Sequence, residues 1–109
     1  AVTGAPIGFA RLDREMRFLK VNDEFARVDG ISADAHVGRS PVDLFLGDSR
    51  EPLLAAFHEA LASGRAADRE FEAEVPAAPG VRFRFATTLF PVRVRGEIAG
   101  VGLVIRSRS

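Results

Sequence analysis

The sequence contains no cysteine, tryptophan or tyrosine, and its aromatic residues are nine phenylalanines. Without cysteine, the chain cannot form a disulfide, a thiol nucleophile or a cysteine-ligated metal site. Its fifteen basic and fifteen acidic side chains cancel, so no charge excess favours a nucleic acid or an acidic surface as partner. No apolar run approaches the roughly 20 residues of a membrane-spanning helix, and nothing at the start resembles a signal peptide. These absences predict a cytoplasmic domain that binds neither nucleic acid nor membrane.

The composition is otherwise that of one small folded domain. The chain has 109 residues, of which 47% are hydrophobic, enough for a single core but not for two. Because Ala1 is not a natural start, we expect residues 1–109 to be one module excised from a longer multidomain protein.

The first third of the chain predicts two short strands followed by a helix. Residues 7–13 and 17–21 form the strands, and the alternation in the second places Phe18 and Lys20 on the face opposite Leu19 and Val21. Asn22 is a preferred N-cap for a helix over residues 23–29. Short helical turns over residues 32–36 and 41–45 follow.

The second half predicts one longer helix and three strands. Residues 49–63 place Leu53, Phe57 and Leu61 on one apolar stripe, and Gly64 ends the helix. The strands are residues 69–75, 81–94 and 98–105. This order predicts an α+β fold, with a five-stranded antiparallel sheet that carries several short helices and one longer helix on a single face.

Short motifs resemble those of PAS domains, the sensor modules of bacterial signalling proteins. They occur in the family's order over nearly the whole chain: Ala5-Pro6-Ile7-Gly8, Leu12-Asp13, Phe18-Leu19-Lys20-Val21-Asn22, Gly30, Val37-Gly38-Arg39, Ala60-Leu61 to Gly64, Pro91-Val92 and Gly96-Glu97-Ile98-Ala99-Gly100-Val101. The resemblance implies the same fold and a regulatory role without enzymatic activity. It also implies an effector domain in the same parent chain.

Some members of the family bind haem or flavin, and the sequence favours neither cofactor here. A histidine on the long helix ligates iron in haem-binding members, but His58 is closer to Gly64 than that ligand usually is, and a partly buried or rim histidine is the favoured interpretation. Covalent flavin chemistry in the family's light sensors needs a cysteine, which is absent. Non-covalent flavin favours amides that face the ring, and Asn22 is the only asparagine or glutamine. His36 is expected on a solvated polar turn.

The candidate ligand pocket is apolar. Thr87 shares a strand face with Phe83, Phe85 and Leu89, so its hydroxyl either orients a ligand or bonds locally. The pocket candidates are Phe25, Phe45, Phe57, His58, Phe85 and Thr87. With no Tyr or Trp, such a pocket favours a small apolar ligand or no ligand at all.

The opposite face of the predicted sheet also carries apolar residues. Phe90, Val104 and Phe18 are expected there, although a sheet covered by helices on one side should be polar on the other. We expect either a homodimer through this face or a covering helix N-terminal to Ala1. Arg82 and Arg84 are expected opposite Glu70, Glu72 and Glu74 as a cross-strand charge ladder.

Three functional hypotheses remain open. The first is a sensory domain that binds a small ligand or a partner and relays a packing change to an effector. The second is a ligand-free dimerisation or docking module, and the third and weakest is a small enzyme using His58. No catalytic triad or phosphate-binding loop is evident. The C-terminal Ser107-Arg108-Ser109 lacks the acidic residue of the family's Asp-Ile-Thr-like coupling motif.

Overall fold

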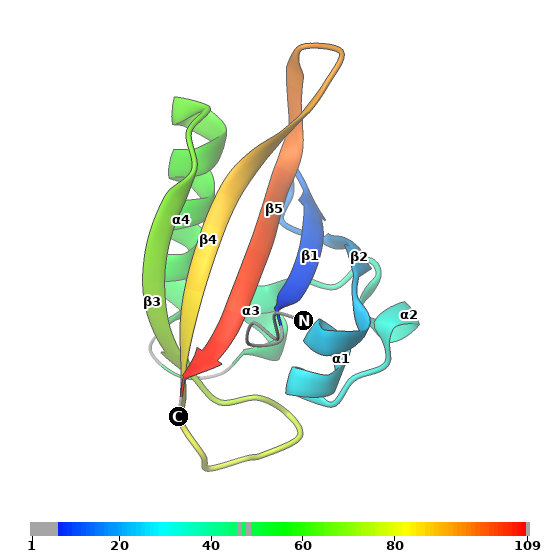
Figure 1. Ribbon diagram of the computed structural model, residues 1–109, viewed down its shortest axis with the longest axis vertical. Helices are drawn as coiled ribbons and strands as arrows, with labels where there is room; N and C mark the ends of the chain where they lie inside the picture. The colour runs from blue at the N-terminus through cyan, green and yellow to red at the C-terminus, as the bar shows by residue number, and fades with distance from the viewer. Residues whose placement is uncertain (1–6, 46, 48, 109) are drawn as a thin grey trace, which may run out of the picture.

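The computed structural model describes residues 7–45, 47 and 49–108 as a five-stranded antiparallel sheet with four helices (Figure 1). In chain order the elements are β1 (Gly8–Asp13), β2 (Phe18–Val21), α1 (Asp23–Asp29), α2 (Ala33–His36), α3 (Pro41–Leu44), α4 (Arg50–Ser63), β3 (Ala67–Ala73), β4 (Phe83–Val94) and β5 (Glu97–Arg108). The strands lie in the order β2-β1-β5-β4-β3. The predicted α+β class, helix order and antiparallel sheet are therefore confirmed, with strand ends shifted by a few residues.

β5 is the central strand because it is apolar on both faces. Its inward residues Val101, Leu103 and Ile105 are buried, and they lie opposite Leu12, Ala10 and Gly8 of β1. α4 packs across β3, β4 and β5 and lies behind the sheet in Figure 1. The core therefore lies between the sheet and the helices.

Asn22 joins the start of α1 to β1. Its Oδ1 accepts hydrogen bonds from the backbone N–H of Phe25 at 3.0 Å and of Phe9 at 2.9 Å, while its Nδ2 donates to the Ile7 carbonyl at 3.0 Å. The predicted N-cap is confirmed, and the same side chain also fixes the helix against the sheet.

The predicted orientation of Phe18 is wrong. A register shift between Arg11 and Leu12 pairs Leu12 with Phe18, so Leu19 and Lys20 are both exposed while Phe18 and Val21 both point inward. Phe18 is fully buried and contributes nothing to the outer face. The extra residue breaks the two-residue alternation on which the prediction relied.

The turn between β1 and β2 is built on the carboxylate of Asp13. One oxygen accepts the backbone N–H groups of Glu15 and Arg17, both at 2.9 Å, and the other accepts Arg17 Nε at 2.9 Å. Partial burial acts to raise the pKa of Asp13, but the hydrogen bonds from Arg17 and Glu15 outweigh it and lower this pKa below its usual value of 3.8. The folded chain therefore favours the ionised carboxylate.

The first testable prediction concerns Asp13→Asn, which removes this carboxylate. The loss of stability that it causes should depend on pH. Since the folded pKa is depressed, the stabilisation is present above pH 3.8 and is lost as pH falls through the folded pKa. We expect the difference in free energy of unfolding between wild type and variant to shrink in acid, as measured by urea denaturation from neutral pH downward. Asp43→Asn, at an exposed carboxylate, is the control. A difference that stays constant with pH would contradict the prediction.

Candidate ligand cavity and outer sheet face

A cavity lies between the sheet and the segment that joins α3 to α4. Its volume is about 30 Å³, which is room for no more than one or two water molecules, so a larger ligand enters only if the lining side chains move apart. The lining residues are Pro41, Phe45, Ser49, Leu53, Phe71, Ala73, Phe85, Thr87, Leu103 and Ile105. They come from both helices and from three adjacent strands, so movement of any of these elements changes the cavity.

The lining is almost entirely apolar. Among the described lining residues none is charged, and hydroxyl groups come only from Ser49 and Thr87, whose side chains are buried. A charged ligand group would therefore lose its hydration without a partner of opposite charge. This site suits an uncharged and largely hydrophobic molecule.

Phenylalanine rings form one wall. The ring of Phe45 lies edge-on to that of Phe85, with 5.9 Å between centroids, and edge-on to that of Phe25, also at 5.9 Å. Phe25 in turn contacts Phe18 and His36. Aromatic contacts thus run from the cavity wall to α1, α2 and β2.

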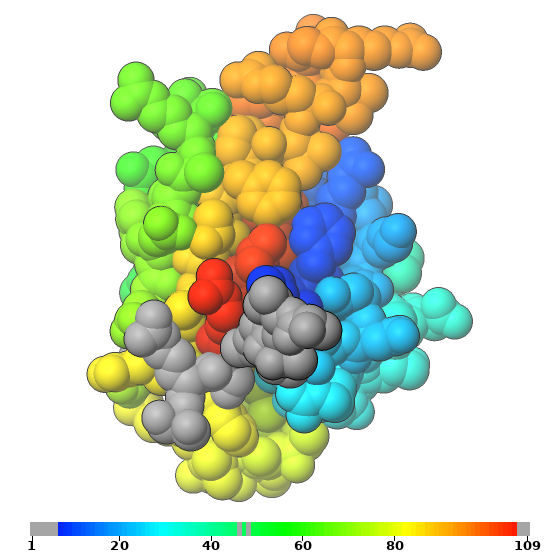
Figure 2. All heavy atoms as spheres, in the orientation of Figure 1, coloured from blue at the N-terminus to red at the C-terminus, as the bar shows by residue number. Residues whose placement is uncertain are grey.

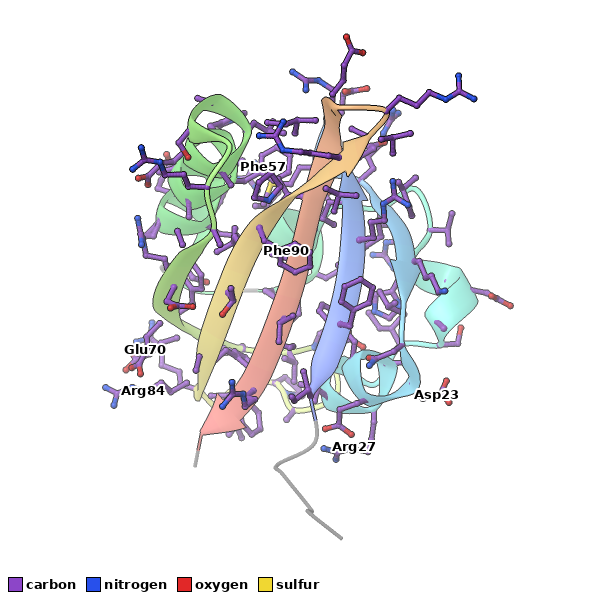
Figure 3. All side chains as sticks on the ribbon, turned by 45° about the horizontal axis from the view of Figure 1, so that its top comes forward. Asp23, Arg27, Phe57, Glu70, Arg84 and Phe90 are labelled. Carbon is purple, nitrogen blue, oxygen red and sulfur yellow. The ribbon has the colours of Figure 1, made fainter. Side chains whose placement is uncertain are left out.

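The structure brings together only part of the predicted pocket set. Phe45, Phe85 and Thr87 line the cavity, and Phe25 lies behind Phe45 in the core. Phe57 is buried and points from α4 toward the sheet, but it does not line this cavity (Figure 3). The placement of His58 in the pocket is wrong, because its side chain is exposed on α4.

Other lining residues were not among the candidates, although their pattern was visible. Leu103 and Ile105 lie on the inward face of β5, and Phe71 lies opposite Phe85 on β3. Two-residue alternation identified their face. Their proximity to Phe45 could not be derived, because that contact depends on how the irregular segment before α4 folds back.

The interpretation of His36 as solvated is also wrong. Its ring is fully buried and pairs with the equally buried carboxylate of Asp29. The two residues end different helices, separated by a left-handed Gly30, so no helical or strand period connects them. A buried pair of this kind leaves no local sequence signal.

The outer face of the sheet carries an aromatic pair. Phe9 of β1 and Phe90 of β4 are stacked, with centroids 6.4 Å apart, and Phe90 lies on the open side of the sheet (Figure 3). The ring of Phe90 lies over Gly102, where any Cβ would overlap it. Val104 of β5 lies on the same face of the sheet as Phe90, and it pairs with Phe9 of β1. Figure 2 shows side chains of β1, β4 and β5 meeting at the centre of this face, and no helix of the described residues lies over it.

Charged residues border this apolar centre. On the β3 and β4 side, Arg82 contacts Glu72 at 3.5 Å, and Arg84 contacts Glu70 and Glu72 at 3.8 Å (Figure 3). The predicted charge ladder is thus confirmed for Glu70 and Glu72, whereas Glu74 accepts the backbone N–H of Gly80 at 2.8 Å. On the β1 side, the half-buried Arg11 has an Nε atom with no hydrogen-bond partner among the described residues.

Two further features limit the chemistry of the described residues. No helix among them is long and apolar enough to cross a membrane. They also contain no group of three or more His, Asp or Glu side chains placed to hold a metal ion. The side chains of the Ser107-Arg108-Ser109 segment are outside the described residues.

Comparisons with known proteins agree with this architecture. A family model described as PAS fold matches residues 2–109. No curated protein matches the chain. A domain of an HTR-like protein from Haloarcula marismortui is similar in structure, with a TM-score of 0.77 and 21% identity over 96% of this chain and 100% of that one. The PAS domain of a Colwellia psychrerythraea protein gives a TM-score of 0.81 and 12% identity over 94% and 86%.

A third similar structure is the complex of Vibrio cholerae VqmA with ligand and DNA. Its TM-score is 0.82 and its identity 16%, over 94% of this chain but only 46% of the VqmA chain. At these identities the structures support the fold alone, whereas the family match spans nearly the whole sequence. The chain therefore belongs to the PAS family, whose domains are sensory and signalling modules.

Proposed function

We propose that this PAS domain is a non-enzymatic sensor in a cytoplasmic signalling protein of bacterial type. It binds a small, uncharged and largely apolar molecule in the cavity between the α3–α4 segment and the sheet. The observation that carries the proposal is the apolar lining, with Phe45 and Phe85 on one wall and the hydroxyls of Ser49 and Thr87 as polar groups. One structure of similar fold is of VqmA bound to DPO, and this supports the proposal by analogy.

Neither haem nor flavin is the ligand we propose. His58 is exposed on α4, away from the cavity, so it is poorly placed to ligate iron inside the domain. The cysteine needed for a flavin adduct is absent, and the amide of Asn22 is already used in capping α1.

The proposed output passes along β5. Leu103 and Ile105 line the cavity, and the same strand continues to Arg108 near the C-terminal end. A ligand that binds one packing of these side chains better than another shifts the balance between the two states. The effector that receives this shift is expected in the same parent chain.

Filling the cavity tests the ligand proposal. Ala73→Leu adds a side chain at a buried lining position, and we expect it to weaken binding of the apolar fluorophore 1-aminoanthracene by at least about tenfold. Thr87→Val keeps the shape and removes a hydroxyl, so affinity should change by less than about threefold. Fluorescence titration measures both affinities, and circular dichroism verifies folding. Unchanged binding by Ala73→Leu would show that the probe does not occupy this cavity.

We further propose that a second copy of the domain covers the outer sheet face. The stacked rings of Phe9 and Phe90 and the adjacent Val104 form an apolar centre, which none of the four described helices covers. The half-buried Arg11 lies on the same face beside this centre. An apolar centre with a charged border suits a partner surface of the same kind.

A charged substitution at the centre of the outer sheet face tests whether the domain dimerises through this face. We expect Val104→Glu to convert a dimer to a monomer in size-exclusion chromatography with light scattering, because a dimer would bury the added carboxylate. Val37→Glu changes an exposed valine at the end of α2 and should leave the dimer intact. A wild-type monomer, or a dimer that tolerates Val104→Glu, would refute the proposal.

The alternative is a ligand-free dimerisation module. The observation that favours it is the densely filled core, in which Phe18, Phe25 and Phe57 are among the largest fully buried side chains. Native mass spectrometry of the purified domain separates the two functions. A bound small-molecule mass supports the sensor, whereas a bare dimer that also fails to bind 1-aminoanthracene supports the module.

A further inference from the structure

The strongest unexplained feature is the buried pair formed by Asp29 and His36. Asp29 is the last residue of α1 and His36 the last of α2, and both side chains are 0% exposed. His36 Nε2 lies 2.5 Å from an Asp29 carboxylate oxygen, Oδ2. Buried ionisable groups are rare unless they are paired, so this contact is a specific feature of the fold.

The hydrogen bond made by the second ring nitrogen of His36, Nδ1, indicates how many protons the Asp29–His36 pair holds. His36 Nδ1 lies 2.8 Å from the Ser32 carbonyl oxygen, which can only accept, so Nδ1 carries a hydrogen. If Nε2 were bare, its lone pair would face the carboxylate at 2.5 Å with no hydrogen between them. The geometry therefore requires a second proton, shared between Nε2 and Oδ2.

No neighbouring group can stabilise the pair in place of this proton. The rings of Phe18 and Phe25 lie edge-on to His36, with centroids 5.1 and 5.7 Å away. The other Asp29 oxygen accepts only the backbone N–H of Ile31 at 3.0 Å, and the Asp29 carbonyl accepts that of Ala77 at 3.2 Å. Among the described residues, no hydrogen bond or ion pair joins the pair to another charged side chain. Removing the proton would leave a buried carboxylate facing a nitrogen lone pair.

We propose that the Asp29–His36 pair is a proton-dependent latch that holds α1, α2 and the loop at residues 75–81 together. With the shared proton present the latch is closed. Release of the proton from between Nε2 and Oδ2 to solvent base opens it. Because Phe25 lies between His36 and Phe45, opening also loosens one wall of the cavity, and this last consequence rests on the proposed ligand site.

The latch predicts a sign for the pH dependence of stability. Closing the latch takes up the shared proton and opening releases it, so a rise in pH favours the open state. Stability should therefore fall as pH rises.

Nuclear magnetic resonance on the intact wild-type domain tests the shared proton directly. With ¹⁵N-labelled histidine, His36 should show hydrogens on both ring nitrogens, or a low-field proton shared with Asp29, at about pH 6 to 7. His58 is the only other histidine, so His58→Gln assigns the signals. A His36 ring with Nδ1 protonated and no proton between Nε2 and Oδ2 at about pH 6 would overturn the proposal.

Matched variants test the latch by stability. The fall in urea midpoint from about pH 6 to 8 should persist in His58→Gln and disappear in His36→Gln, whose amide can donate to Asp29 without titrating. Asp29→Asn should abolish it as well, because the new amide can donate to a neutral Nε2. The Ala77 amide should lose hydrogen-exchange protection over the same range in wild type and His58→Gln, but not in the other two variants. Equal pH dependence in His36→Gln and wild type would overturn the latch, whatever the cavity binds.

Discussion

Alanine in place of Gly100 is expected to lower the free energy of unfolding by about 3 kcal/mol, in spite of adding a single methyl group. Gly100 lies opposite Asp13 in the central β1–β5 pairing, and a Cβ there would overlap the backbone carbonyl of Leu12. A backbone atom within a paired strand cannot rotate away, so the two strands must separate locally. Urea denaturation monitored by circular dichroism measures the loss.

Gly102→Ala is the matched control, two residues along the same strand and on the same face. A Cβ at Gly102 would overlap the ring of Phe90, which is a half-buried side chain on the open face. This ring can swing outward, so we expect a loss of about 1 kcal/mol. Equal losses for the two variants would contradict the distinction between backbone and side-chain obstruction.

Truncation of Phe57 to alanine is expected to cost about 3–5 kcal/mol, a large share of the roughly 5–15 kcal/mol that stabilises a domain of this size. Phe57 is 1% exposed and anchors α4, the longest helix, against the sheet. The variant leaves a cavity that the rigid sheet cannot close. The measurement is the urea midpoint at constant slope.

The same substitution at Phe90 provides the comparison. Phe90 is half-buried on the outer face and stacks on Phe9, so we expect Phe90→Ala to cost about 1 kcal/mol in the monomer. If a second copy covers this face, Phe90→Ala should also weaken the dimer, whereas Phe57→Ala should act on folding alone. A larger stability loss at Phe90 than at Phe57 in the monomer would show that the helix–sheet core is not the main source of stability.

Local sequence patterns were sufficient for much of the fold. Asn22 before an acidic first turn predicted the cap of α1, and the spacing of Leu53 and Phe57 predicted the buried side of α4. Alternation along the last two strands placed Phe90 and Val104 on the outer face. Each of these predictions depends on residues within a few positions of one another, which regular backbone geometry relates directly.

The errors occurred where the backbone departs from a regular period. One extra residue in β2 turned Phe18 from the outer face to the core. His36 was expected in solvent, and it is buried because α1 and α2 pack together beside β2 and bring Asp29 to its ring. His58 lies one position beyond the buried stripe of α4, close enough to Phe57 for a ring contact yet exposed. Neither helical nor strand spacing distinguishes these outcomes.

The sequence by itself determined the α+β class, the order of the elements, the family and the apolar character of both sheet faces, because hydrophobic period and capping residues act locally. Only the tertiary structure decided which residues meet in the cavity, which phenylalanines form its wall and that Asp29 and His36 share a dry contact. The physical reason is that these features join segments across irregular turns and a strand bulge, where direction is set by the packing of the whole chain and not by neighbouring residues.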